Sequence, residues 1–128
     1  MIRTAPELIA AWTEMWNSYD LDQVERLFLP DDRLTYLSSE RQGVIRGYEA
    51  IVAHHQGFGF VAGGKASENR LWLSGLVYAG FDQATVVAGT WHFQRGSGPE
   101  QRGPVTFVCG RQSGAYRFWH LNFGNYPA

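Results

Sequence analysis

Several residue patterns that define whole classes of protein are missing from this sequence. Its one cysteine, Cys109, cannot form an intramolecular disulfide, and no cysteine or histidine spacing matches a metal site. No apolar run approaches the ~20 residues of a membrane-spanning helix. Met1–Ala10 has no basic head followed by an apolar core, so no signal peptide is expected. We therefore expect a cytoplasmic protein without metal, cofactor or membrane partner.

The chain also lacks an excess of charge of either sign. Its 11 basic residues stand against 12 acidic ones, which gives a formal net charge of −1 at pH 7. Domains that bind nucleic acid carry a basic patch or stripe, and none is visible here. We expect no nucleic-acid partner.

Apolar and aromatic residues, in contrast, are plentiful. The chain has 128 residues, of which 45% are hydrophobic and 15% aromatic, and five of them are tryptophans. This is enough material for one well-formed core. No internal repeat or linker interrupts the sequence, so we predict a single domain over residues 1–128.

The first third of the chain has helical periodicity. Thr4 and Glu7 form a capping box. Apolar residues then recur at helical spacing, namely Leu8, Trp12, Met15, Trp16 and Tyr19. Asp20 is predicted to cap a second, short helix that Pro30 ends. A third helix is predicted over residues 48–56.

After residue 64 the apolar period changes from 3.6 to 2, which predicts strands. Four long strands are expected, over residues 70–78, 83–94, 104–111 and 115–123, after a short hairpin over 34–37 and 44–45. Their alternation places one apolar set on a concave face: Val87, Gly89, Trp91, Phe93, Val105, Phe107, Cys109, Trp119, Leu121 and Phe123. The predicted fold class is α+β, with helices packed on one face of a curved antiparallel sheet.

This element order, together with the run Arg111-Gln-Ser-Gly-Ala-Tyr-Arg-Phe-Trp-His120, resembles the nuclear transport factor 2-like superfamily, in its SnoaL-like and ketosteroid-isomerase-like branch. Members commonly end with a strand of the form Gly-x-Trp-Arg-Ile-x-His. The pair Asp31-Asp32 and the residue Gly47 also match. The resemblance extends from about Glu7 to Asn125. It implies a cone-shaped sheet with three N-terminal helices, a cystatin-like roll, curled around a pocket.

Ketosteroid isomerases use a carboxylate base near the end of the first strand, a tyrosine on the first helix and a protonated aspartate on a late strand. The resemblance places these roles at Leu37, Trp12 and Phe107, and all three are apolar. A shift of one residue in the first strand would give Tyr36 or Ser38, and neither is a carboxylate. We therefore do not expect isomerisation by that mechanism.

His55 is the strongest candidate for a catalytic residue. The resemblance places it on the pocket side of the third helix, where a histidine can act as a general base or bond a ligand. Tyr36, Tyr19 or Thr35 would be its polar partner. The alternative interpretation is a buried histidine bonded to a backbone carbonyl. His54, about 100° further around the helix, is expected to point outward.

The expected pocket is lined by Trp12, Trp16, Leu37, His55, Trp91, Phe107, Trp119, Leu121 and Phe123. Aromatic walls suit a flat hydrophobic ligand, such as a polyketide, steroid or terpene fragment. The first hypothesis is a small-molecule binding protein or weak enzyme of the SnoaL-like group. The second is an isomerase, cyclase or dehydratase that uses His55 as its base. The third is a dimeric interaction module with a closed core.

The other phase of the strands predicts a mixed outer face, made of Thr90, His92, Thr106, Val108, His120 and Asn122. Such a composition is typical of a dimer interface, so we predict a homodimer through this face. If the phase is reversed, His120 and Asn122 become pocket residues instead. The sequence does not assign a face to Trp72.

Overall fold

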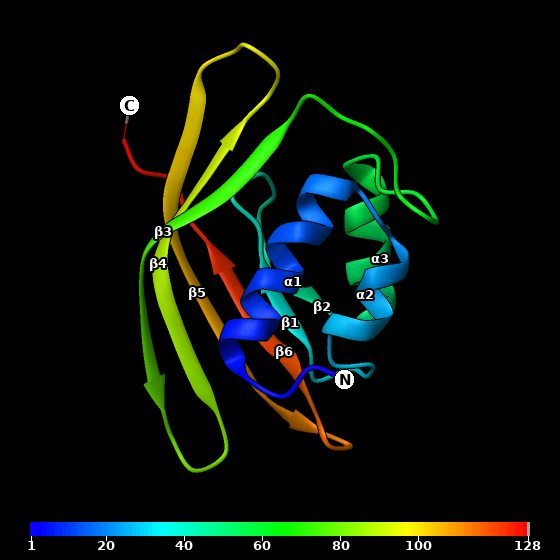
Figure 1. The fold of residues 1–128 in the computed structure, drawn as a ribbon, viewed down its shortest axis with the longest axis vertical. Coiled ribbons are helices and arrows are strands. Elements are labelled where there is room, and N and C mark those ends of the chain that lie inside the picture. The colour runs from blue at the N-terminus through cyan, green and yellow to red at the C-terminus, as the bar shows by residue number, and fades with distance from the viewer. Residues whose placement is uncertain (128) are drawn as a thin grey trace.

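The computed structural model describes residues 1–127 and shows helices on one side of a curved sheet (Figure 1). The helices are α1 (Ala5–Ser18), α2 (Asp22–Leu27) and α3 (Tyr48–Gly57). The strands are β1 (Thr35–Leu37), β2 (Ile45–Arg46), β3 (Arg70–Gly80), β4 (Thr85–Gln94), β5 (Glu100–Gln112) and β6 (Ala115–Phe123). The predicted α+β class is confirmed.

The start of α1 follows the predicted capping box. The Thr4 side chain accepts a hydrogen bond from the Glu7 backbone N–H at 3.2 Å. The helix ends at Tyr19, which adopts a left-handed conformation with φ 55°. Helix α2 begins slightly later than expected, at Asp22, whose backbone N–H donates to the Asp20 carboxylate at 3.0 Å.

The sheet has the strand order β2-β1-β6-β5-β4-β3. Strands β3 to β6 form the expected antiparallel meander, but β1 pairs with β6 in parallel. The expectation of an entirely antiparallel sheet is therefore wrong, and the sheet is mixed. Parallel neighbours need a long connection between them, and here α3 and the meander provide it.

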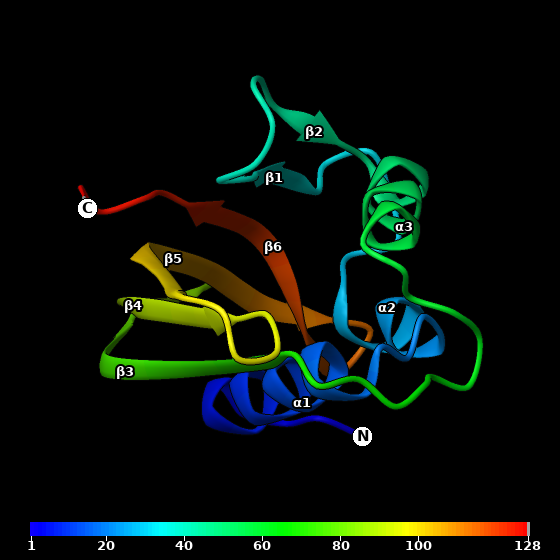
Figure 2. The ribbon, with the colours of Figure 1, turned by 90° about the horizontal axis from the view of Figure 1, so that it is seen from above.

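The sheet curls so that its two ends approach different helices. Figure 2 shows it running from β3 through β6 to the β1–β2 hairpin, with α1 near β3 and α3 beside β2. Alternating residues of β4 and β5 are buried on the side of the helices, as predicted: Val87, Trp91, Phe93, Val105, Phe107 and Cys109. The core thus lies between the concave face and the helices.

Strand β6 contains a bulge that changes which residues face the core. Val108 on β5 lies opposite His120, but the next residue, Cys109, lies opposite Phe118. Trp119 is therefore an extra residue in β6. The two-residue period is broken there, and the strand presents Phe118 to the concave side.

The expected placement of Trp119 on the concave face is consequently wrong. Phe118 is fully buried, with its ring 5.3 Å from that of Phe107 between centroids. Trp119 is only half-buried, and its ring lies over Gly110, where a Cβ atom would collide with it. Alternation alone does not reveal a bulge, because the residue pattern around it is apolar on both sides.

Within residues 1–127, no helix is long and apolar enough to cross a membrane. In the same span, no group of three or more histidine, cysteine, aspartate or glutamate side chains could hold a metal ion.

Candidate ligand cavity

A partly open cavity lies between the concave face of the sheet, α1 and α3. Its walls are mostly aromatic or aliphatic: Trp12, Trp16, Tyr36, Phe58, Leu71, Trp91, Phe93 and Phe123. Its polar lining comes mainly from two connecting segments and α3: Ser38, Ser39, Glu40, His54, Arg95 and Gln101. The cavity therefore has an apolar interior and a polar rim.

The volume of this cavity is about 50 Å³. Sites for drug-sized ligands are typically about 300–1,000 Å³, whereas one buried water needs on the order of 10–15 Å³. As it stands, the cavity has room for a few waters. A flat polycyclic ligand would enter only if side chains at the rim moved.

Two tryptophans of α1, Trp12 and Trp16, line the cavity. Trp12 is fully buried and Trp16 is 6% exposed. The indole N–H of each has no hydrogen-bond partner among residues 1–127. In contrast, the Trp91 N–H donates to the backbone carbonyl of Gly124 at 2.9 Å. An unpaired buried donor costs about 1–3 kcal/mol, so a ligand oxygen that accepts from it recovers that energy.

The positions of these indoles are set by aromatic packing from three strands. The Trp12 ring lies 5.1 Å from Phe107 and stacks on Phe123 at 5.7 Å, measured between centroids. Trp16 contacts Phe93 edge-on at 6.1 Å. Rings at these separations and angles attract one another, so the wall is preorganised.

His54 lines the cavity, although the sequence suggested that it points outward. Its ring lies 5.0 Å from Tyr36 and 5.1 Å from Phe58. Because α3 is enclosed by both the β1–β2 hairpin and α1, two neighbouring residues can both face protein. The Nε2 atom of His54 is buried and has no partner within the described chain. Burial, aided by the Arg41 charge, lowers the pKa of His54 and favours its neutral form.

His55 is fully buried beside the cavity and does not line it. Its Nδ1–H donates to the Ile51 carbonyl at 2.8 Å, as the alternative interpretation predicted. The ring is enclosed by aromatic neighbours, namely Trp16, Phe28, Tyr36, His54 and Phe60. Burial lowers the pKa of His55 to about 4, so the imidazole is neutral at neutral pH. The role of general base that the sequence suggested stays a prediction.

Strand β1 faces the cavity with Tyr36 and not with Leu37. Tyr36 lies opposite Leu121 in the parallel ladder, which fixes its inward phase, and Leu37 lies opposite Asn122 in the outward phase. The expectation that Leu37 lines the pocket is therefore wrong by one residue. Tyr36 is buried, and desolvation raises the pKa of its phenol, which keeps the hydroxyl protonated.

The rim is held by weak interactions around Arg95. Its guanidinium lies 5.1 Å from the Phe93 ring centroid and 3.9 Å from the Glu40 carboxylate. Both charged side chains are about half exposed, and an exposed ion pair of this kind contributes at most about 1 kcal/mol. A charged group on a ligand could therefore replace either partner at small cost.

Of the nine expected pocket residues, the structure brings together four on the cavity wall: Trp12, Trp16, Trp91 and Phe123. Phe107, Leu121 and His55 lie behind them in the packed core. The rim residues were not predicted from the sequence, because loops have no periodicity from which a face can be inferred. The one available signal was Glu40, a carboxylate shortly after the first strand.

Comparison with known proteins gives the fold but not the activity. No protein-family model matches the sequence, and the search of curated proteins returned no match. Solved structures do match. A nuclear transport factor 2-like superfamily protein from Salmonella enterica has a TM-score of 0.77 and 18% identity, covering 95% of this chain and 88% of that one.

Two further structures carry functional names. One is described as a "putative" association domain of calcium/calmodulin-dependent protein kinase type II, from Thiobacillus denitrificans, with a TM-score of 0.81, 15% identity and coverage of 99% and 98%. The other is described as a "putative" ketosteroid isomerase from Parabacteroides distasonis. It has a TM-score of 0.73 and 15% identity, covering 96% of this chain and 89% of that one. The chain has the nuclear transport factor 2-like, cystatin-like fold that the resemblance implied.

Proposed function

We propose that this protein binds a small, largely hydrophobic molecule in the aromatic cavity. One observation carries the proposal: Trp12 and Trp16 line a cavity, and the buried indole N–H of each has no partner among the described residues. Proteins rarely leave buried donors unpaired unless water or a ligand satisfies them. The ligand therefore carries at least one hydrogen-bond acceptor, such as a carbonyl or hydroxyl oxygen.

The charge distribution supports a ligand whose buried part is neutral. His54 is held neutral by burial, and Tyr36 is held protonated. An ion placed between such groups would lose its hydration without gaining a counter-charge. The rim differs, because Arg95 and Glu40 lie there and can meet a charged end of the ligand.

The small volume favours a compact ligand, and because a benzene-binding cavity is about 150 Å³, even a substituted benzene would require side chains at the rim to move. A larger planar ligand would require the rim segments to separate. The weak pairing between Arg95 and Glu40 is compatible with such an opening.

The experiment compares ligands that differ in one acceptor. Acetophenone and ethylbenzene have similar shapes, but only acetophenone has a carbonyl oxygen. We expect acetophenone to quench tryptophan fluorescence and raise the melting temperature more than ethylbenzene does. Trp12→Phe and Trp16→Phe remove the donors and should reduce this preference, while Trp72→Phe, on the outer face, should not. Equal weak responses to both compounds in all variants would contradict the proposal.

We also propose that the protein forms a homodimer through the outer face of the sheet. Thr106, Val108 and Asn122 share the outward phase of adjacent strands, and a half-buried valine among polar residues suits an interface. The likeness to a protein named as an association domain supports the same idea. This would add an assembly role to ligand binding.

A further inference from the structure

Three polar side chains on the outer face form a connected chain that is separate from the cavity. The hydroxyl of Ser74 on β3 lies 2.6 Å from Nε2 of His92 on β4. The other ring nitrogen of His92, Nδ1, lies 2.8 Å from the carboxylate of Glu100 on β5. A hydroxyl, an imidazole and a carboxylate are thus linked in that order.

The strand register explains this arrangement. His92 lies opposite Trp72 on β3 and opposite Arg102 on β5. Ser74 and Glu100 are each displaced by two residues from those positions, so all three share the outward phase and lie within diagonal reach. The sheet thus brings together residues from three consecutive strands, separated by 18 and 8 residues along the chain.

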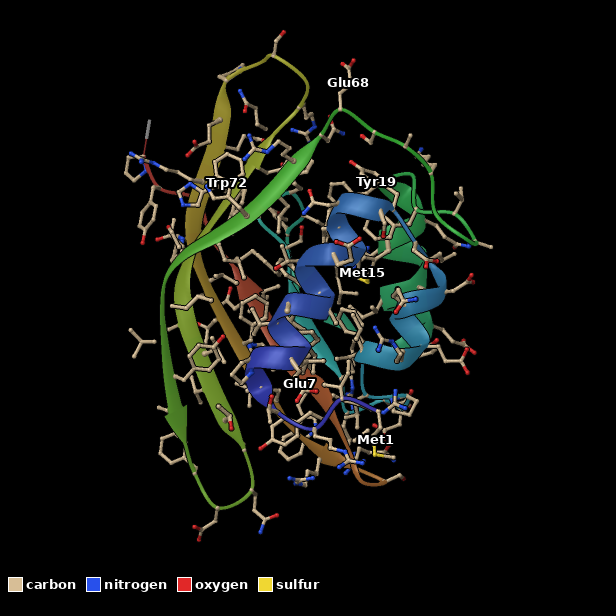
Figure 3. The ribbon with its side chains drawn as sticks, viewed as in Figure 1. Met1, Glu7, Met15, Tyr19, Glu68 and Trp72 are labelled. Atoms are coloured by element: carbon tan, nitrogen blue, oxygen red, sulfur yellow. The ribbon has the colours of Figure 1, made fainter. Side chains whose placement is uncertain are left out.

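Trp72 holds the imidazole in place. Its ring lies 5.0 Å from that of His92 with an interplanar angle of 2°, which is parallel stacking. Figure 3 shows Trp72 on the side of β3 away from α1, which assigns it to the outer face. His92 has only 13% of its side chain exposed, although it lies on the surface. Its two hydrogen bonds and this stacking fix its orientation.

The hydrogen-bond partners define the tautomer of His92. Glu100 can only accept, so Nδ1 carries the hydrogen and donates it. Nε2 is then free to accept from the Ser74 hydroxyl. A nucleophile bonded to a base, which is itself oriented by a third group, is the arrangement that activates serine in acyl transfer.

We propose that Ser74, His92 and Glu100 form a nucleophilic centre that hydrolyses small esters. The Ser74 oxygen attacks the ester carbonyl carbon and forms a C–O bond while Nε2 of His92 takes its proton. The resulting tetrahedral adduct collapses: the bond to the leaving alcohol breaks, and that oxygen takes the proton from Nε2. Water then attacks the acyl-serine, giving a proton to Nε2, and the serine oxygen regains that proton as it leaves. The net reaction is ester plus water to acid plus alcohol.

The surroundings leave room for an acyl group. Ser74 is exposed, and Gly75, which follows it, has a positive φ of 61° in a bulge opposite Gly89. A side chain at Gly75 would meet nothing within 4 Å among the described residues. The serine hydroxyl is therefore approachable from solvent.

The neighbouring charges suggest which esters fit. The Arg70 guanidinium lies 4.8 Å from the Trp72 ring centroid, and Arg102 is exposed opposite His92. An ester with an aromatic or acidic acyl group would contact both the indole and the cations. Because the face is open, we expect weak substrate binding and a high KM.

The centre is compatible with the proposed dimer. On β5, Arg102 and Val108 are six residues apart, and a strand rises about 3.3 Å per residue, so the two regions are separated by about 20 Å. Ser74 is in register with Pro104, four residues or about 13 Å from Val108 along β5, so it stays in solvent when the interface lies on the Val108 side of that register.

The test uses an aryl fluorophosphonate, which reacts with activated serines, and 4-nitrophenyl acetate as a substrate. We expect fluorophosphonate to label Ser74, located by mass spectrometry of the digested protein, and Ser74→Ala to abolish both labelling and the enzyme-dependent release of nitrophenol. His92→Gln and Glu100→Gln should each slow release by about 10²-fold, the usual scale for a positioned base.

The chain contains a matched control on the same face. Thr35 and His120 form another hydroxyl–imidazole pair, 2.8 Å apart, and His120 has no carboxylate partner within residues 1–127. Thr35→Ala and His120→Gln should leave the rate unchanged. Release that persists in Ser74→Ala, or that falls equally in the control variants, would overturn the proposal, as would a folded wild-type protein that is not labelled. Ser74→Cys, which keeps a nucleophile, separates loss of chemistry from loss of folding.

Discussion

The two faces of the sheet provide different environments for histidine. On the concave side, His54 and His55 are packed among aromatic rings, and the Nε2 of each lacks a partner within the described chain. On the outer side, both ring nitrogens of His92 are bonded to neighbouring side chains. Burial keeps the imidazoles of His54 and His55 neutral. Because their Nε2 atoms have no partner within the described chain, these atoms remain available to hydrogen-bond a ligand or water. The hydrogen bonds of His92 to a hydroxyl and a carboxylate instead fix the orientation of its ring, as the proposed role of a general base requires.

The same contrast applies to the tryptophans. Trp12 is enclosed on all sides, whereas Trp72 covers His92 at the surface. The concave side therefore combines stability with a binding cavity, and the outer side contributes little to the core. The two faces can be tested separately because few residues belong to both.

The largest expected effect is the loss of a buried indole. Trp12→Ala should destabilise the fold by about 3–5 kcal/mol, because it removes a fully buried side chain and leaves a void. Trp72→Ala, its counterpart on the outer face, should cost much less. Urea unfolding of both variants measures the difference. Similar losses would show that the outer face carries as much packing energy as the core.

The next effect concerns pH and His55. The pKa of a histidine in an unfolded chain is about 6.5, and burial lowers that of folded His55 to about 4. Between these values the unfolded state binds a proton that the folded state does not, so stability falls as pH falls. At 1.36 kcal/mol per pH unit the total loss is about 3 kcal/mol.

Unfolding free energies measured from pH 7 to pH 4 test this prediction. His55→Leu removes the titrating group, so its curve should be flatter than that of the wild type, whatever its absolute stability. Leu8→Val, at another fully buried position without a titrating group, serves as the control and should keep the wild-type slope. Parallel curves for wild type and His55→Leu would mean that His55 binds a proton as readily in the folded protein as in the unfolded chain, which would contradict the prediction.

A smaller effect should follow from filling the space that Trp119 occupies at the bulge. A methyl group at Gly110 would collide with the Trp119 ring, so Gly110→Ala should destabilise the protein by about 1–3 kcal/mol. Gly80→Ala meets nothing within 4 Å among the described residues and should be neutral or slightly stabilising. In the double variant Gly110→Ala/Trp119→Ala, the part of the penalty due to the indole should disappear, while the contact between the methyl group and the Gln83 backbone oxygen, 2.8 Å away, remains. A penalty of unchanged size would mean that the Gln83 backbone contact, and not the Trp119 ring, causes the destabilisation.

The accuracy of the sequence-based predictions differed from strand to strand. Periodicity located the helices and strands, and it placed Trp91 and Phe107 correctly because β4 and β5 alternate without interruption. It misplaced Trp119, because a bulge adds one residue and leaves no trace in an apolar run. It misplaced Leu37, because in a strand of three residues the phase is set by the pairing partner, β6, and not by local pattern.

The candidate sites were harder to predict than the fold. The cavity rim comes from segments around Glu40 and Arg95, whose positions depend on tertiary packing. Ser74, His92 and Glu100 come from three strands, and only the strand register reveals that they meet. The sequence does not show that these three residues meet, because their contact depends on how β3, β4 and β5 pair in the folded sheet.

The substitution Val108→Asp should have the smallest effect on folding stability and the largest effect on dimer formation. If two copies pair through their outer faces, Val108→Asp places two like charges close to the two-fold axis and should convert a dimer into a monomer. Its effect on monomer stability should stay within about 0.5 kcal/mol, as for most surface changes. Val61→Asp, at an exposed valine in the segment after α3 that pairs with Asp20 on the helix side, introduces the same charge away from the proposed interface and should leave the dimer intact. Sedimentation at micromolar concentration distinguishes the cases: a monomeric wild type refutes the dimer, and equal behaviour of the two variants refutes its location.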